Sequence, residues 1–424
     1  MPDSPRLGTP AVPPVTRMVN PVRDYDWGSA SVLAHLQGRE PHGGPEAELW
    51  MGAHPSSPSG LVTGPDAAAR PLPEAVADDP KALLGDDVVT RFGPRLPFML
   101  KVLAVERPLS LQVHPDAARA LAVHDPAGGS PYVDAYAKPE LIVAVEPMSA
   151  IFGFRPAAEA ARLLASLGTP QAAALAADLS AALAAGEGDD AALRGAFRRL
   201  VTWPADDVPA LVAAAAAAVA GPPETPETPE GPESPGDDQV AAEARRWVGR
   251  LAELHPRDPL VLAPLLLGLI RLAPGEAVFV PAGVPHAYLS GTGVEVLAAS
   301  DNVVRAGLTT KRIDVAELLA IVDSRPGAEP LTPAVDLGDG ESAWQPPVPD
   351  FRLTRVPVAG TARPAAEVGG PQILFCLRGS VTVRAGGAEV ALRGGESAFV
   401  TAAAGPLELA GEGEVFRAAC GVLL

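Results

Sequence analysis

Two stretches of this sequence repeat one pattern: Gly275-Glu-Ala-Val-Phe-Val-Pro-Ala-Gly-Val-Pro-His286 and Gly395-Glu-Ser-Ala-Phe-Val-Thr-Ala-Ala-Ala-Gly-Pro406. They align without a gap at an offset of 120 residues, and the match continues where Gly291 and Gly293 fall on Gly411 and Gly413. Each copy consists of short apolar segments separated by glycine turns, which is typical of a small β-barrel or jelly roll. The repeat therefore predicts two related barrels.

The two copies differ at the positions that could carry chemistry. Pro281 and Gly283 are expected to form a tight turn that directs His286 into the first barrel. This spacing resembles the second cupin motif, Gly-x5-Pro-x-Gly-x2-His-x3-Asn, with Ser290 at the position of the motif's Asn. The equivalent positions of the second copy hold residues that cannot bind a metal in the same way: Thr401, Ala403 and Pro406. We therefore predict one metal-binding cupin and one degenerate, structural cupin.

A predicted strand with one polar face supplies further ligands. In the segment 109–114, apolar and polar residues alternate, which places Gln112 and His114 on the same face. On these two residues alone, a half-solvated sheet edge is an equal alternative. With Glu140 and His286 the set becomes one amide oxygen, two imidazoles and one carboxylate, which predicts an open divalent-metal site that favours zinc. The other histidines are expected to be surface or packed residues: His35, His42, His54, His124 and His255.

The composition argues against several classes of protein. A chain of 424 residues is expected to form two or three domains. The longest apolar run, 260–270, is about half as long as a membrane-spanning helix requires, and residues 1–6 do not resemble a signal peptide. With two cysteines we expect no disulfide framework, and a net charge of -18 argues against a nucleic-acid partner. We therefore expect a cytoplasmic protein that binds neither membrane nor nucleic acid.

The hydrophobic pattern predicts a mainly β protein with an α-helical insertion. Strands are expected at 97–103, 109–114, 140–145 and 275–280, and helical structure at 72–92. Alanine-rich stretches with leucine at helical spacing predict further helices at 158–187, 190–200, 208–220 and 240–254. The predicted domains are a discontinuous metal-binding cupin (1–156 and 257–330), a helical insertion (157–256) with an acidic, proline-rich linker (222–239), and a C-terminal degenerate cupin (331–424).

Seven segments, spread over nearly the whole chain, carry a more specific resemblance: Tyr25-Asp-Trp-Gly-Ser29, Glu48-Leu-Trp-Met-Gly52, Pro97-Phe-Met-Leu-Lys-Val-Leu103, Leu109-Ser-Leu-Gln-Val-His-Pro115, Lys138-Pro-Glu140, Pro281-Ala-Gly-Val-Pro-His-Ala-Tyr288 and Ser300-Asp-Asn-Val-Val-Arg-Ala-Gly-Leu-Thr309. In this order they resemble the type I mannose-6-phosphate isomerase (phosphomannose isomerase) family. The resemblance implies a zinc enzyme, with one ion per chain, that interconverts mannose 6-phosphate and fructose 6-phosphate through a cis-enediol. It also implies the metal ligands Gln112, His114, Glu140 and His286.

The same resemblance implies a set of substrate contacts. Arg305 and Lys311 are expected near the phosphate or the reacting carbons, and they belong to a basic cluster in an acidic protein. The further implied substrate contacts are Ser110, Lys101, Trp27 and Glu48. Without the resemblance, a solvated surface pair is the alternative for the basic residues, and core packing is the alternative for Trp27.

The implied isomerisation requires a base over the C1–C2 edge of the sugar, an electrophile at its oxygens, and an acid and a base for ring opening. The residues that could supply these groups are Lys138, Arg305, Glu295, Asp301 and Tyr288, of which Lys138 and Arg305 are the first candidates. The sequence departs from the family's His-Lys-Pro-Glu at one position, because Ala137 precedes Lys138. If that histidine normally assists ring opening, this protein must use water or another group, or react more slowly.

Two other functions are compatible with parts of the pattern. A non-catalytic metal-binding cupin that senses a phosphosugar is favoured only by Ala137, and it has less need of Lys138 and Arg305. An iron-dependent cupin oxygenase is disfavoured by the glutamine ligand and the basic cluster. Another aldose phosphate stays open as a side substrate. The expected partner is a small sugar phosphate, bound by a monomer.

Overall fold

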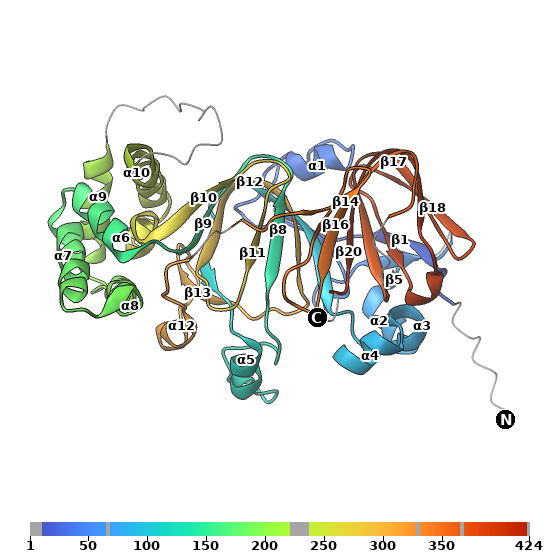
Figure 1. Cartoon of the computed structure of the whole chain (residues 1–424), viewed down its shortest axis with the longest axis horizontal. Helices are drawn as coiled ribbons and strands as arrows, with labels where there is room; N and C mark the ends of the chain where they lie inside the picture. Colours follow the sequence, from blue (N-terminus) through green and yellow to red (C-terminus); the bar gives the residue numbers. More distant parts are fainter. Residues whose placement is uncertain (1–10, 65–67, 221–236, 328–330, 365–368, 422–424) are drawn as a thin grey trace.

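The computed structural model of the chain describes residues 11–64, 68–220, 237–327, 331–364 and 369–421, and residues 222–236 of the predicted linker lie outside this part. Three groups of elements follow one another along the longest axis of the molecule (Figure 1). Helices lie at one end, a β-barrel lies in the middle, and a second β-structure lies at the other end. This architecture confirms the predicted mainly β fold with an α-helical insertion.

The central barrel is organised around the long strand β12 (His286–Ala298). Its second half pairs antiparallel with β6 (Phe98–Val105) on one side and with β8 (Glu140–Ala144) on the other. Its first half pairs with β7 (Leu111–Val113) and β9 (Met148–Phe154). Because one strand belongs to both walls, the sheet curls into a jelly roll. The other strands of this barrel are β2 (Val22–Arg23), β3 (Glu48–Met51), β10 (Leu267–Leu272), β11 (Ala277–Val280) and β13 (Val304–Gly307).

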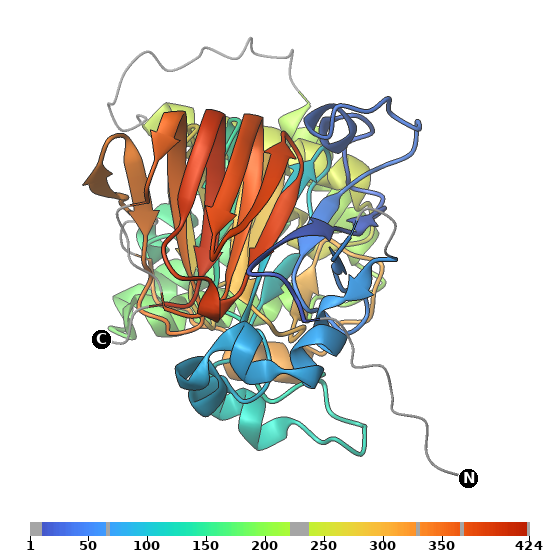
Figure 2. The same cartoon turned by 90° about the vertical axis from the view of Figure 1, so that its right-hand side faces the viewer.

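The second β-structure contains both C-terminal and N-terminal strands. Its C-terminal strands are β14 (Val335–Gly338), β15 (Glu341–Trp344), β16 (Arg352–Ala362), β17 (Gln372–Ala385), β18 (Ala388–Arg393), β19 (Ser397–Val400) and β20 (Glu408–Ala419). The N-terminal strand β1 (Val15–Val19) pairs with β19 and with β4 (Gly60–Val62), which pairs with β5 (Arg70–Pro71). The first strand of the chain thus lies beside one of the last, and Figure 2 views this sheet from its outer side.

The internal repeat is confirmed by the structure. The first aligned stretch contains β11 and leads into β12, and the second contains β19, continues through the short 3-10 helix η2 (Ala402–Ala404) and leads into β20. Gly291 and Gly411, which align in the sequence, both have positive φ, at 106° and 135°. A Cβ atom at Gly291 would lie 2.3 Å from the carbonyl oxygen of Pro147, and one at Gly411 would lie 2.2 Å from that of Ser380. The repeat therefore reflects the same backbone approach in both barrels.

The helical group is inserted between β9 and β10. It contains α6 (Ala157–Ser166), α7 (Pro170–Ala184), α8 (Gly188–Val201), α9 (Val208–Val219) and α10 (Asp237–Leu254), followed by η1 (Pro259–Leu262) and α11 (Ala263–Leu266). Alanine and leucine favour helix throughout, and the Thr169 side chain caps α7 by accepting from the N–H of Ala172. Phe197 of α8 packs edge-on against Phe154 of β9, with ring centroids 5.4 Å apart, which attaches the helices to the barrel.

The region 72–92 is helical as predicted, and it consists of three short helices. These are α2 (Leu72–Asp78), α3 (Pro80–Leu84) and α4 (Asp86–Phe92), separated at Asp79 and Gly85. Asp79 caps α3 by accepting from the N–H of Ala82. The remaining helices are α1 (Val32–Leu36), α5 (Ala117–Val123) and α12 (Val315–Ile321).

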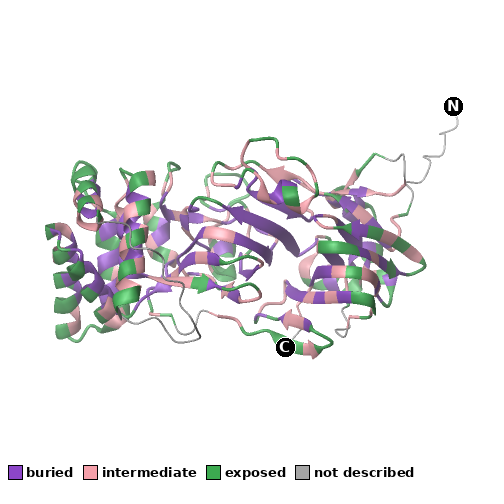
Figure 3. Ribbon diagram, turned by 90° about the horizontal axis from the view of Figure 1, so that it is seen from above, coloured by how far each residue is buried: buried purple, intermediate pink, exposed green. Residues whose placement is uncertain are grey.

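The two β-structures share one apolar core. Phe98 and Leu100 of the central barrel belong to the same buried cluster as Phe375 and Phe416 of the C-terminal sheet. Figure 3 shows buried residues along the strands of both β-structures. Each barrel therefore forms part of the surface against which the other packs. Across the described part of the chain, no helix combines the length and apolar character needed to cross a membrane.

Candidate metal and active site

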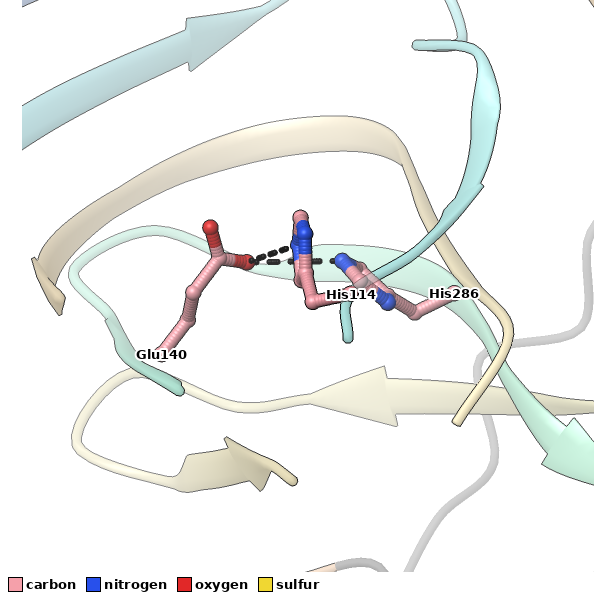
Figure 4. A group of neighbouring side chains, drawn as sticks. All are labelled: His114, Glu140 and His286. Atoms are coloured by element: carbon pink, nitrogen blue, oxygen red, sulfur yellow. Dashed lines mark ion pairs between the residues drawn. The ribbon is translucent and has the colours of Figure 1, made fainter. Parts of the chain in front are cut away.

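Three buried side chains meet at one end of the central barrel (Figure 4). His114 follows β7, Glu140 begins β8 and His286 begins β12. The Oε2 atom of Glu140 lies 3.4 Å from His114 Nε2 and 3.3 Å from His286 Nε2. Within the described residues, none of these three buried atoms has a hydrogen-bond partner. Three unpaired ligand atoms that face one another fit a bound metal ion, which would satisfy all of them.

Backbone contacts fix the orientation of the two imidazole rings. His114 donates from Nδ1 to the carbonyl oxygen of Asn302, at 2.8 Å, and His286 donates from Nδ1 to that of Val284, at 3.0 Å. Because carbonyl oxygens only accept, each Nδ1 carries the proton and each Nε2 presents its lone pair to the site. The predicted turn contributes directly, since the N–H of Gly283 donates to the carbonyl oxygen of His114 at 2.9 Å.

Strand register places two further predicted residues on the same face as His286. Gln112 of β7 lies opposite His286 of β12 and opposite Arg305 of β13. Directly opposite residues of antiparallel strands project to the same side of the sheet, so the three side chains form a row. Gln112 is thus the cross-strand neighbour of His286, and Arg305 lies one strand further out. Arg305 has no hydrogen-bond or ion-pair partner among the described residues.

The local charges hold these groups in the forms that bind metal. Burial lowers the pKa of His114 to about 4, although Glu140 opposes this shift. Burial alone would raise the pKa of Glu140, but the Lys138 ammonium and the two imidazoles bring it well below its usual range. Lys138 Nζ lies 2.9 Å from Glu140 Oε1. The imidazole of His114 is therefore neutral and the carboxylate ionised at neutral pH.

A second buried charge cluster lies on the inner face of β3, β6 and β12. Lys101 Nζ is 3.3 Å from Glu48 Oε2 and 3.8 Å from Glu295 Oε2, and the Tyr288 hydroxyl donates to Glu295 Oε1 at 3.2 Å. Burial opposes the charge of Lys101, but Glu48, Glu295 and Glu140 together raise its pKa. Burial and the charge of Glu140 raise the pKa of Glu295 to about 8, against the effect of Lys101. At pH 7 the buried carboxyl of Glu295 is thus mainly protonated.

Asp301 lies at the edge of this site and is paired with His54, which was predicted to be a surface or packed residue. His54 is buried, its ring packs edge-on against Trp50, and its Nε2 lies 2.7 Å from Asp301 Oδ2. The hydrogen bond from His54 is the largest effect on Asp301 and lowers its pKa, with further lowering from Lys138 and Lys101. His54 is therefore a packed residue that does not belong to the metal group, as expected. Its contact with Asp301 was missed because Asp301 is 247 residues away.

The other predicted substrate contacts have different surroundings. Ser110 is half-buried and precedes β7, whereas Lys311 is exposed in the loop after β13. Trp27 stacks on Tyr25 and packs against an apolar cluster that includes Tyr288. Ala137, which replaces the family histidine, is half-buried immediately before Lys138.

The geometry agrees with two matches to known protein families. The catalytic domain of type I phosphomannose isomerase matches residues 15–157, and the cupin domain of mannose-6-phosphate isomerase matches residues 344–420. The mannose-6-phosphate isomerase of Escherichia coli K12 is 35% identical over 413 residues, covering 95% of this chain and 98% of the relative. That of Rattus norvegicus is 33% identical over 382 residues, covering 85% of this chain and 86% of the relative.

Solved structures of the same enzyme match almost the whole chain. A substituted variant of phosphomannose isomerase from Salmonella typhimurium superposes with a TM-score of 0.83 at 32% identity, covering 97% of this chain and 100% of the other. A mannose 6-phosphate isomerase described as zinc-bound superposes with a TM-score of 0.81 at 31% identity, covering 97% and 100%. With this agreement over nearly its full length, the chain belongs to the type I phosphomannose isomerase family.

Proposed function

We propose that this protein interconverts mannose 6-phosphate and fructose 6-phosphate. The observation that carries this conclusion is the buried group of His114, Glu140 and His286, whose facing ligand atoms lack partners and lie beside the Lys138 ammonium. The reaction moves a proton between C1 and C2 of the sugar through a cis-enediol. Such a site must polarise the sugar oxygens and hold a proton-transfer group within reach of the two carbons.

Zinc is the metal that this donor set fits best. Two imidazoles and a carboxylate are ligands that zinc favours, and the amide oxygen of Gln112 would be a fourth ligand. When bound, one zinc ion per chain supplies positive charge that polarises the substrate oxygens and stabilises the charge of the enediol. The Nδ1 hydrogen bonds of His114 and His286 keep both ligands oriented toward it.

The substrate phosphate is assigned to the outer end of the row that contains His286 and Gln112. Arg305 has no described partner for its guanidinium, and it lies on the same face as the metal ligands. Arginine offers the planar fork that suits phosphate. Lys311, six residues after Arg305, is assigned as a second charge, and Ser110, two residues before Gln112, as a hydroxyl that contacts the phosphate. Lys101, by contrast, already pairs with Glu48 and lies 3.8 Å from Glu295, so we assign its charge to the interior of the site.

Proton transfer is assigned first to Lys138, with Glu295, Asp301 and Tyr288 as supporting groups. Lys138 Nζ lies next to the ligand Glu140, so it holds a proton at the edge of the metal group. Glu295 carries a proton at neutral pH and shares a hydrogen bond with Tyr288, so this pair can exchange a proton with a sugar oxygen. Glu48 and Trp27 are assigned to the wall of the sugar site.

The oligomeric state, the location and the domain boundaries complete the proposal. We propose a cytoplasmic monomer with a sugar phosphate as its small-molecule partner. The proposed domains are 1–156 with 257–330 for catalysis, 157–256 as the helical insertion and 331–424 as the degenerate cupin, to whose sheet the N-terminal strand is added. A phosphosugar sensor is not favoured, because its only support is Ala137. A cupin oxygenase is disfavoured by the Gln112 amide and the basic residues.

The deciding experiment follows fructose 6-phosphate formation from mannose 6-phosphate with purified protein, before and after chelation and again after zinc is restored. We expect activity that disappears with the chelator and returns with zinc. His286→Ala should lose both zinc and activity, whereas the exposed His35→Ala should keep both. A folded protein that holds zinc and converts no mannose 6-phosphate would contradict the proposal and favour the sensor.

A further inference from the structure

Asn302 is a fully buried residue whose side chain is saturated by one loop of the chain. Its Oδ1 accepts from the N–H groups of Val133, at 2.9 Å, and Asp134, at 3.3 Å. Its Nδ2 donates to the carbonyl oxygens of Asp134 and Tyr136, both at 2.8 Å. A primary amide has two N–H donors and one oxygen with two lone pairs, so this loop uses its full capacity. A buried amide with every group paired holds its partners rigidly.

The backbone of the same residue contacts a metal ligand. The carbonyl oxygen of Asn302 accepts from His114 Nδ1 at 2.8 Å, and this contact directs the Nε2 lone pair toward Glu140 and His286. Partners of this kind fix the tautomer and the ring orientation of a metal-binding histidine. A shift of residue 302 therefore moves the ligand.

The loop held by the Asn302 side chain leads directly to Lys138. Only Ala137 separates Tyr136, whose carbonyl oxygen Asn302 binds, from Lys138, whose Nζ lies 2.9 Å from Glu140 Oε1. Neighbouring contacts reinforce this attachment, because the Asp134 carboxylate accepts from the Ser300 hydroxyl at 2.9 Å and from the N–H of Asp301 at 3.1 Å. The segments 133–136 and 300–302 thus form one hydrogen-bonded unit, which we call the latch.

We propose that Asn302 is a positioning residue that sets the orientation of His114 and the place of Lys138 together. The side chain of Asn302 contacts the 133–136 loop and its backbone carbonyl contacts His114, so the residue acts through these two partners. The part of the inference that concerns turnover rests on the function proposed above, whereas the part that concerns zinc affinity stands without it. One side chain thereby couples metal binding to the placement of the proton-transfer group.

The test is Asn302→Asp, which keeps the shape but removes the two donors and places a carboxylate against the carbonyl oxygens of Asp134 and Tyr136. Zinc affinity is measured by competition with a chromophoric chelator, and kcat and KM are measured at saturating zinc. We expect zinc binding to weaken about 10-fold to 100-fold and kcat to fall by a similar factor, with little change in KM. The matched control is Val133→Ala, because Val133 is 69% exposed and its N–H, which contacts Asn302, is retained.

A folded Asn302→Asp variant with wild-type zinc affinity and kcat would overturn the proposal. This holds even if the variant has a lower melting temperature, because Asn302 would then contribute only to stability. If this variant does not fold, Asp134→Asn is the second test. Asp134 is half-buried, and the substitution weakens the hydrogen bonds that its carboxylate accepts within the latch. It is expected to lower kcat while the protein stays folded, and an unchanged kcat would overturn the proposal. Wild-type turnover is measured first, so that failure of the isomerase assignment is recognised separately from the zinc titration.

Discussion

His54 donates from Nε2 to Asp301 Oδ2 over 2.7 Å, while its Nδ1 accepts from the N–H of Ser56. The pair joins a buried imidazole to a carboxylate that is partly exposed at the edge of the site. Ala137 stands where the family has a histidine, and the His54–Asp301 pair supplies an imidazole outside the metal group, with a carboxylate whose pKa Lys138 and Lys101 also lower. We therefore predict that this pair takes the place of the missing side chain in ring opening.

We expect Asp301→Asn to lower kcat/KM for mannose 6-phosphate by about 100-fold or more, because a positioned acid or base typically contributes about 100-fold to 10,000-fold. Zinc content should be unchanged, since Asp301 is outside the metal group. Asp87→Asn, on the exposed surface of α4, is the matched control and should behave as wild type. Full activity of the Asp301 variant would exclude this pair from ring opening.

Arg305→Ala should raise KM for mannose 6-phosphate by about 10-fold to 100-fold, because a hydrogen bond to a charged group contributes about 1.5–3 kcal/mol. Inhibition by inorganic phosphate should weaken in parallel, whereas zinc affinity should not change. The control is Arg312→Ala, which removes an exposed arginine further along the same segment. A loss of kcat with unchanged KM and unchanged phosphate inhibition would instead place Arg305 at the reacting carbons.

The raised pKa of Glu295 predicts a pH dependence of stability in the metal-free protein. Its pKa is about 8 in the folded protein, against the ordinary glutamate value of 4.5, so the folded state retains a proton that the unfolded state releases. The stabilisation is complete below pH 4.5 and is lost progressively as the pH rises through 8, by on the order of a few kcal/mol. Glu295→Gln cannot titrate, so its melting temperature should fall less between pH 5 and 8, as calorimetry would measure. Parallel curves would contradict the buried, protonated carboxyl.

A substitution at Gly411 tests how much the close backbone packing of the degenerate barrel contributes to stability. Gly411→Ala would place a Cβ atom 2.2 Å from the carbonyl oxygen of Ser380 at a positive φ, and should lower the free energy of unfolding by about 3 kcal/mol or more. The control is Gly360→Ala, because Gly360 lies opposite Gly411, also has positive φ, and has open space around its Cβ position. Gly360→Ala should cost less, about 1 kcal/mol. Equal losses in denaturant unfolding would contradict the steric argument.

Features encoded by local spacing could be predicted from the sequence. The repeat predicted two related barrels, because the same glycine-bounded strands recur at 275–286 and 395–406. The metal group was predictable because the alternation of Gln112 and His114 already implies one face, and His286 ends a turn of recognisable spacing. The helices of the insertion followed from alanine and leucine content, which acts locally.

Features that depend on long-range contacts could not be predicted in this way. His54 and Asp301 are far apart in sequence, and Asn302 resembles any asparagine of a loop until its partners at 133–136 are known. The apolar run 260–270 contains most of η1, all of α11 and the start of β10, and this change from helix to strand has no local signal because a buried segment has no alternation to reveal its period. The pairing of Val15 with Val400 likewise has no local signal.

The place of β1 has a consequence for the order in which the protein can be completed. On the ribosome, β1 and β4 emerge among the first segments. The strand β19, which pairs with the other edge of β1, emerges only after the helical insertion and most of the C-terminal barrel. Until then one edge of β1 has its backbone groups unpaired, and such an edge can pair with another chain. The N-terminal part of the second β-structure therefore carries an open edge through most of the chain's synthesis. Closure of that edge by residues 397–400 marks the end of its vulnerable period.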